Sequence, residues 1–192
     1  MNRVALTIGA AAVAAVLAGQ SGAAKVKVHA DHEKAFNFSQ ARTWAWSPES
    51  PGDIILARTP YDDPALVRER VQPVIFSTVN TELPKRGLKP ASGAPDLTMR
   101  YYLLLTIGSS AQTLGQFLPA TTSWGLPPFT SSTTSLQIMQ QGSLVLDFSA
   151  NGKVVWRGLA EAQLKMDLSL EQRAAIVRES VEEILKQYPP KR

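Results

Sequence analysis

The Asn151-Gly152 turn constrains the fold of this chain most strongly, because Asn-Gly between two alternating runs is the strongest short-range signal for a β-hairpin. It separates two strand-like runs, residues 136–148 and 154–164. Gln140-Gln141-Gly142 in the first run is a candidate β-bulge. A third run, residues 98–107, alternates apolar and polar side chains, which predicts a strand with one face on a core. We therefore expect an antiparallel sheet.

A first helix is expected after Asp62-Asp63-Pro64, since Asp is a favoured N-cap and proline suits the first helical turn. Pro73 lies inside this helix and should kink it. Pro84 and Gly87 mark its end. Its apolar stripe has the three- and four-residue spacing of a helix packed on a sheet. The stripe comprises Val67, Val71, Val74, Ile75, Val79 and Leu83.

A second helix begins with a capping box, with Ser169 as the N-cap and Gln172 at N3, and Pro189-Pro190 ends it. Its apolar stripe comprises Val177, Val181, Ile184, Leu185 and Tyr188. Residues 25–30 and 43–46 alternate and are expected to be short strands, while residues 47–52 have loop composition. The order β-β-α-β-β-β-α predicts an α+β fold, a mostly antiparallel sheet with two helices packed on one face.

The first 24 residues have the pattern of a secretory signal peptide, with Arg3 before an apolar run and small residues after it. We expect cleavage after Ala23 or Ala24, so that residues 25–192 form one domain in the periplasm. Leu17-Ala18-Gly19 matches the box of the lipoprotein signal peptidase, but Gln20 stands where Cys would carry the lipid. Three explanations stay open: the anchor was lost in this lineage, the Cys was replaced, or Leu-Ala-Gly is simply a tripeptide common in signal peptides. Outer-membrane association follows only if the Cys was replaced.

Composition limits the classes of partner and of chemistry. The chain is 44% hydrophobic and 19% charged, as in ordinary globular proteins, and its net charge is +4. The basic residues are scattered rather than gathered in a stripe, which argues against nucleic acid. The chain has no cysteine, which excludes disulfides and a cysteine nucleophile. We expect no transmembrane span in the mature chain and no cofactor.

Few residues suggest catalysis or metal binding. His29 and His32 are the only histidines, and on a strand they point to opposite faces, which is poor geometry for two-histidine ligation. The acid pair Asp62-Asp63 is explained by helix capping, and Glu182-Glu183 by a solvated helix face. A hydrolase that uses an acid pair is the least favoured reading. We therefore expect no metal site and no enzymatic activity.

The long segment of residues 108–135 is the expected functional surface, since loops of this length in compact domains are usually functional or disordered. It is rich in Gly, Ser, Thr and Pro, with isolated large apolar groups that are costly to leave in water. The candidate partner contacts are Phe117, Trp124, Leu126 and Phe129. In contrast, Trp44, Trp46 and Trp156 lie in alternating strands and are expected to be core residues rather than a carbohydrate platform.

Three segments together resemble a bacterial family called domain of unknown function 4136. They are residues 37–46, with Arg42-Thr43-Trp44-Ala45-Trp46; Pro95-Asp96-Leu97; and residues 142–158, which end in Trp156-Arg157-Gly158. The resemblance covers nearly all of the mature chain. It implies an envelope location, since family members are mostly predicted lipoproteins, but no activity. Gln20 departs from the lipid-bearing Cys that such proteins often carry, which puts membrane anchoring in doubt.

Two functions remain open from the sequence. The first is a non-catalytic accessory module of the cell envelope. It would contact an unknown envelope protein through the loop and through a mixed sheet face bearing Arg100, Tyr102, Leu104 and Thr106. The second is a carrier of a small molecule or lipid, with a groove between the sheet and residues 108–135. The sequence does not specify the oligomeric state, the partner or the ligand.

Overall fold

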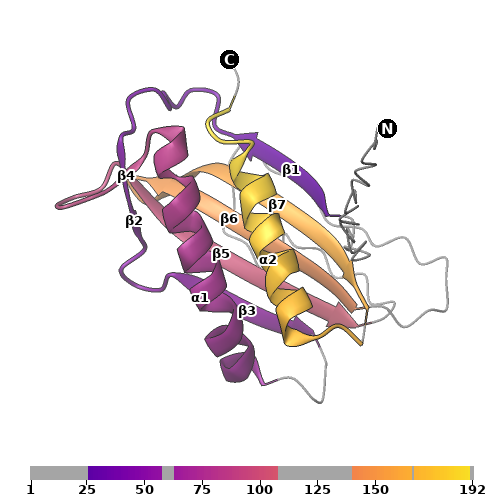
Figure 1. Cartoon of the computed structure of the whole chain (residues 1–192). Helices are drawn as coiled ribbons and strands as arrows, with labels where there is room; N and C mark the ends of the chain where they lie inside the picture. Colours follow the sequence, from indigo (N-terminus) through magenta and orange to yellow (C-terminus); the bar gives the residue numbers. More distant parts are fainter. Residues whose placement is uncertain (1–25, 58–62, 108–139, 166, 191–192) are drawn as a thin grey trace, which may run out of the picture.

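The computed structural model describes residues 26–57, 63–107, 140–165 and 167–190. Within them one seven-stranded sheet forms one layer and two helices form a second layer on a single face of it (Figure 1). The strands are β1 (Lys27–His32), β2 (Thr43–Trp46), β3 (Gly52–Ala57), β4 (Lys89–Pro90), β5 (Leu97–Ile107), β6 (Gln140–Ala150) and β7 (Lys153–Leu164). The helices are α1 (Pro64–Glu82) and α2 (Leu170–Leu185), and a short 3₁₀ helix, η1 (Pro84–Arg86), follows α1.

The centre of the sheet is antiparallel, as expected. The strand order is β1-β7-β6-β5-β2-β4, and the pairs β1–β7, β7–β6 and β6–β5 are antiparallel. Asn151 and Gly152 connect β6 to β7 with φ angles of 52° and 75°, the left-handed conformation that a tight hairpin turn requires. The predicted hairpin is therefore confirmed.

The sheet is mixed rather than antiparallel throughout, which corrects the finer part of the prediction. β2 and β3 both pair parallel with β5, and β4 pairs parallel with β2. Gly52, assigned to a loop by composition, begins β3 and pairs with Tyr101 of β5, whose ring occupies the space that a Cβ at position 52 would need. β4 has only two residues, too few for any periodicity to reveal it.

The bulge also lies elsewhere than expected. Pairing between β6 and β7 is regular from Gln140 to Phe148, and the register shifts between Phe148 and Ser149. The irregularity therefore lies next to the hairpin turn, where Ser149 pairs with Val154 and leaves Val155 as the extra residue.

Both helices begin as the sequence predicts. The Asp63 side chain accepts a hydrogen bond from the Ala65 amide at 2.8 Å, with Pro64 at the first helical position. Ser169 and Gln172 form the complete capping box of α2. Pro73 lies within α1 with its side chain exposed. Neither helix of the described segments has the length and apolar character needed to cross a membrane.

The main core lies between the helices and the sheet. Most of the two predicted stripes are buried there, and Ile75, Val79, Val181 and Ile184 are fully enclosed. Trp156 is also fully buried, Trp44 is nearly so, and Trp46 packs partly buried against the same core. The expectation that these indoles are core residues is confirmed for Trp44 and Trp156, while Trp46 lies at the edge of the core.

Candidate functional site

The side chains that face the helices become smaller along the central hairpin. Starting at the turn, successive cross-strand pairs on this face are Phe148 with Trp156, Leu146 with Gly158, Leu144 with Ala160, and Gly142 with Ala162. At the turn end, aromatic rings fill the core, with Phe148, Trp156 and Tyr188 in mutual contact. At the other end the small side chains cannot fill the space beneath the helices, and a cavity results.

This helix–sheet cavity has a volume of about 260 Å³. Its lining includes residues from the first turns of α1 and α2, and both helices begin at the same end of the helix layer (Figure 1). Leu170 lines it and is 62% exposed, so the cavity opens to the surface beside the first turn of α2. The described apolar lining comprises Val67, Val71, Leu103, Leu105, Gly142, Leu144, Ala160, Ala162, Leu164, Leu170, Ala174, Ile176 and Val177.

The polar side chains of the described lining are Arg70, Arg173 and Ser180. Arg70 is on α1 and is exposed, while Arg173 is on α2 and is half-buried. The Arg173 Nε donates a hydrogen bond to the Leu168 carbonyl at 3.2 Å. Each helix thus contributes one guanidinium group to a mainly apolar lining, and no carboxylate or histidine belongs to the described lining.

Polar contacts fix α1 against the sheet beside the cavity. The Arg68 Nη1 donates to the Gly52 carbonyl at 2.8 Å, and the Tyr101 hydroxyl donates to the Gln72 Oε1 at 2.8 Å. Burial is the main cause that raises the pKa of Tyr101, so the hydroxyl stays protonated and remains a donor at neutral pH. The cavity wall formed by α1 is therefore anchored.

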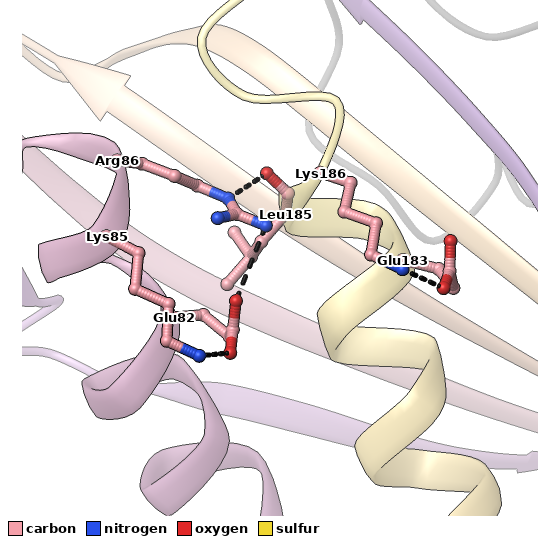
Figure 2. A network of polar contacts seen from close by, with 6 residues as sticks. All are labelled: Glu82, Lys85, Arg86, Glu183, Leu185 and Lys186. Carbon is pink, nitrogen blue, oxygen red and sulfur yellow. Dashed lines mark hydrogen bonds and ion pairs between the residues drawn. The ribbon is translucent and has the colours of Figure 1, made fainter.

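The opposite ends of the helices are joined by a polar network (Figure 2). The Arg86 Nε donates to the Leu185 carbonyl at the end of α2, and its guanidinium also pairs with Glu82 at 3.4 Å. Lys85 pairs with Glu82 as well, and Lys186 pairs with Glu183. Cations at helix C-termini are favourable, since carbonyl dipoles accumulate there. The helices are thus joined at one end and enclose the cavity at the other.

The outer face of the sheet, opposite the helices, carries a row of alternating charges. Asp31 on β1 pairs in register with Arg157 on β7, Arg157 with Asp147 on β6, and Asp147 with Arg100 on β5. Arg157 and Asp147 form a buried bidentate pair with two contacts of 2.7 Å. Burial raises the pKa of Asp147, against the lowering effect of Arg157. Arg100 pairs with Asp53 at 3.0 Å in a more exposed position.

The mixed outer face is less accessible than expected. Tyr102 and Leu104 are buried in a small apolar cluster with Val145 and Leu159. Arg100 is half-buried and also lies over the Tyr102 ring, with its Cζ 5.6 Å from the centroid. Several side chains that the sequence suggested as contacts for a polar partner therefore already pack or form pairs within the domain.

The residues that carry the family resemblance have structural roles. Asp96 accepts hydrogen bonds from the Arg42 amide, the Thr43 amide and the Thr43 hydroxyl, at 2.9, 2.8 and 2.8 Å. These bonds join the first two of the resembling segments, and they lower the pKa of Asp96. A Cβ on Gly158 would lie 2.3 Å from Ile184 and 2.6 Å from the Trp156 ring, so only glycine allows α2 to approach β7 so closely.

The other candidate residues do not converge on a site. His29 is exposed beside Leu159, and the His32 ring contacts Phe38 edge-on at 5.7 Å. Among the described residues, no group of three or more histidine or acidic side chains is placed to hold a metal ion. Phe117, Trp124, Leu126 and Phe129, with the rest of residues 108–135, lie outside the described residues, as do Asp62 and the expected signal peptide.

A second hollow of about 810 Å³ lies at the opposite end of the domain. It is lined by backbone and side chains around His32, Phe38, Arg42 and Tyr188, with Arg86 at one side. Arg86 is already bonded to α2, and burial raises the pKa of Tyr188 to about 12. Its described lining is more polar than that of the helix–sheet cavity, and ligand pockets are lined mainly by apolar side chains, so the helix–sheet cavity is the stronger candidate.

Comparison with known proteins identifies a family and a similar fold but indicates no activity. The model of a family described as "Domain of unknown function (DUF4136)" matches residues 28–190. No curated protein matches the chain. Part of a PDZ domain protein from Parabacteroides distasonis has a similar fold, with a TM-score of 0.51 and 13% identity; the match covers 89% of this chain but 38% of that protein.

PelC dodecamers from Paraburkholderia phytofirmans are more distant. Two crystal forms match with TM-scores of 0.35 and 0.37 at 10% and 9% identity. They cover 84% and 88% of this chain, and 95% and 100% of those chains. At this level of similarity neither match bears on the function of the cavity.

Proposed function

The chain belongs to the DUF4136 family, and we propose that it is an exported, non-catalytic binding protein of the cell envelope whose ligand occupies the helix–sheet cavity. The cavity is the observation that carries the proposal. It is enclosed by both helices and three strands, has a mainly apolar lining and opens to the surface beside Leu170. Ligand sites of small proteins commonly have this character.

The energetics of the cavity favour an occupant. Empty volume in a core costs roughly 24 cal/mol per Å³, so a closed void of 260 Å³ would cost about 6 kcal/mol. This is an upper limit, because the cavity opens to the surface and water can enter, but it is a large part of the 5–15 kcal/mol that stabilises a typical domain. A bound apolar group would recover much of that free energy.

The lining also supports binding rather than catalysis. General acid–base chemistry uses a histidine, a carboxylate or another group that exchanges protons near neutral pH. The described lining offers two arginines, whose guanidinium groups are donors only, and one serine. Export is supported by the N-terminal sequence pattern, which predicts that the domain works outside the cytoplasm.

The accessory-module function is the second candidate. The Arg100–Asp53 pair favours it, because it is the partly exposed part of the charged outer face, with side chains 31% and 43% exposed. The deeper charges of that face are paired internally, which leaves less of it available to a partner. We therefore rank ligand binding in the cavity first.

A cavity-filling variant tests the proposal. Ala174 lines the cavity, and its neighbour Ala175 is exposed on the same helix. Ala174→Leu should abolish fluorescence enhancement of the neutral apolar probe N-phenylnaphthylamine, whereas the matched control Ala175→Leu should bind it like the parent protein. Equal binding by both variants would place the probe elsewhere and contradict the proposal. Native mass spectrometry of protein from its own periplasm should show a small co-purifying ligand.

A further inference from the structure

We infer that the helix–sheet cavity takes a neutral, mainly apolar molecule with one hydroxyl group at its inserted end, and that Ser180 binds this group. The inference rests on the proposed function and adds the chemical class of the ligand. It follows from where the polar and the apolar side chains lie along the cavity.

Ser180 is the buried polar side chain of the described lining. It is 5% exposed, whereas Arg70 is exposed and Arg173 is half-buried. Both arginines lie within the first two turns of their helices, at the end where Leu170 leaves the cavity open. Ser180 follows Leu170 in α2 by three turns, which places it about 15 Å further along the helix axis. The serine hydroxyl is therefore far from the opening.

The cavity ends just beyond Ser180. One row of α2 residues, at steps of three and four, faces the sheet. The row comprises Leu170, Ala174, Val177, Ser180 and Ile184. All of them line the cavity except Ile184, which is fully buried. Ile184 packs directly onto Gly158 of β7, where a Cβ would lie 2.3 Å from it. This contact closes the space, so Ser180 lies at the inner end of the cavity.

The position of this hydroxyl selects the chemistry of the occupant. A serine hydroxyl donates one hydrogen bond and accepts up to two. A purely apolar occupant would cover it and offer no bond, which is unfavourable for a buried polar group. A charged group is excluded from the inner end, because a serine cannot neutralise it and burial of an ion costs far more. A neutral hydroxyl on the ligand both donates and accepts, and it therefore matches Ser180.

The size of the cavity suggests suitable probes. Its volume of about 260 Å³ exceeds the roughly 150 Å³ of an apolar cavity that admits benzene. A small aromatic alcohol is therefore a reasonable choice. 3-Phenylpropanol carries its hydroxyl at the end of the chain. In butylbenzene a methyl group replaces that hydroxyl, so the two probes have nearly the same shape and differ in hydrogen bonding.

Calorimetric titration of both probes into the parent protein and Ser180→Ala tests the inference. The variant should bind 3-phenylpropanol about fivefold more weakly, the effect of one lost neutral hydrogen bond. Its affinity for butylbenzene should change by less than about twofold, because that probe loses no hydrogen bond. Ser77→Ala is the matched control, since Ser77 is an exposed serine of α1 outside the lining. It should bind both probes like the parent.

An isomeric alcohol gives a second measurement that needs no variant. In 1-phenyl-1-propanol the hydroxyl lies next to the ring rather than at the end of the chain. The parent protein should bind this isomer about fivefold more weakly than 3-phenylpropanol, because its hydroxyl cannot reach Ser180 when the molecule is inserted. Equal affinity for the two isomers would overturn the placement of the hydroxyl at the inner end.

The outcomes separate the inference from the proposed function. If Ser180→Ala changes the affinity for both probes of the first pair by the same factor, or changes neither, Ser180 does not bind the ligand hydroxyl. That result would overturn the inference and leave the cavity as an apolar site. If the parent protein binds neither probe, the inference and the proposed function both fail. A loss confined to 3-phenylpropanol, with both probes blocked by Ala174→Leu, is the expected result.

Discussion

Removing Arg157 should destabilise the protein far more than breaking the exposed ion pair on the same face. The Arg157 and Asp147 side chains are 6% and 2% exposed, and both hydrogen bonds between them are 2.7 Å long. Arg157→Met leaves Asp147 buried without its guanidinium partner. Breaking a buried pair in this way costs about 3–5 kcal/mol, which agrees with the loss of two charge-assisted hydrogen bonds of about 1.5–3 kcal/mol each.

The Arg100–Asp53 pair is an internal control, since it joins the same residue types on the same face. Its side chains are 31% and 43% exposed, with one contact of 3.0 Å. Asp53→Asn should therefore cost at most about 1 kcal/mol. Replacing both buried charges, as Asp147→Leu/Arg157→Met, should recover most of the stability lost in the single variant, because Asp147 is then no longer a buried charge without its guanidinium partner.

Urea unfolding at neutral pH measures all four proteins, and the midpoints are comparable if the slopes agree. For a chain of this length, a loss of 4 kcal/mol lowers the melting temperature by roughly 8–16 °C. If Arg157→Met costs no more than Asp53→Asn, water reaches the buried pair and the outer face is open. That result would contradict our ranking of the outer face below the helix–sheet cavity as a binding surface.

Three further predictions concern other parts of the chain. Gly158→Ala should cost about 1–3 kcal/mol by overpacking, since the new Cβ would lie 2.3 Å from Ile184; a denaturation midpoint equal to the parent's would contradict this. Asp96→Asn should destabilise the protein above about pH 4 and less below it. The hydrogen bonds from Arg42 and Thr43 lower the folded pKa beneath its ordinary 3.8, so the stabilisation is complete above the unfolded pKa and is lost as pH falls through the folded one; a pH-independent difference would exclude this linkage. Intact mass after expression in a Gram-negative host should show a mature chain that begins at residue 24 or 25, and a soluble chain still carrying residue 1 would argue against the signal peptide.

Local signals in the sequence were sufficient for much of the fold. The Asn151-Gly152 turn and the caps at Asp63 and Ser169 each depend on a few neighbouring residues, and the structure has all of them in the expected conformation. The helical stripes were equally readable, because burial on one side of a helix imposes its period on the sequence.

Features that depend on residues far apart in the chain could not be predicted from such local signals. Gly52 belongs to a strand because it pairs with Tyr101, which is far along the chain and whose ring fills the space beside it. No turn motif in the sequence indicates the parallel pairing of β3 with β5, since parallel strands are joined by a long crossover. The apolar run of β3 is short, and its proline- and serine-rich approach has the composition of a loop.

The cavity was missed although its signal is present in the sequence. Once residues 142–148 and 156–162 are paired across the turn, the helix-facing side chains decrease from Phe148 and Trp156 to Gly142 and Ala162. Alternation alone distinguishes inside from outside and treats all apolar residues alike, so it cannot detect a change in volume along one face. A helix layer that rests on large rings at one end and on glycine and alanine at the other must leave space at the second end, unless its own side chains are larger there. The α2 residues that line the cavity include the small Ala174 and Ser180 beside the larger Leu170, Ile176 and Val177, and together they leave the space open.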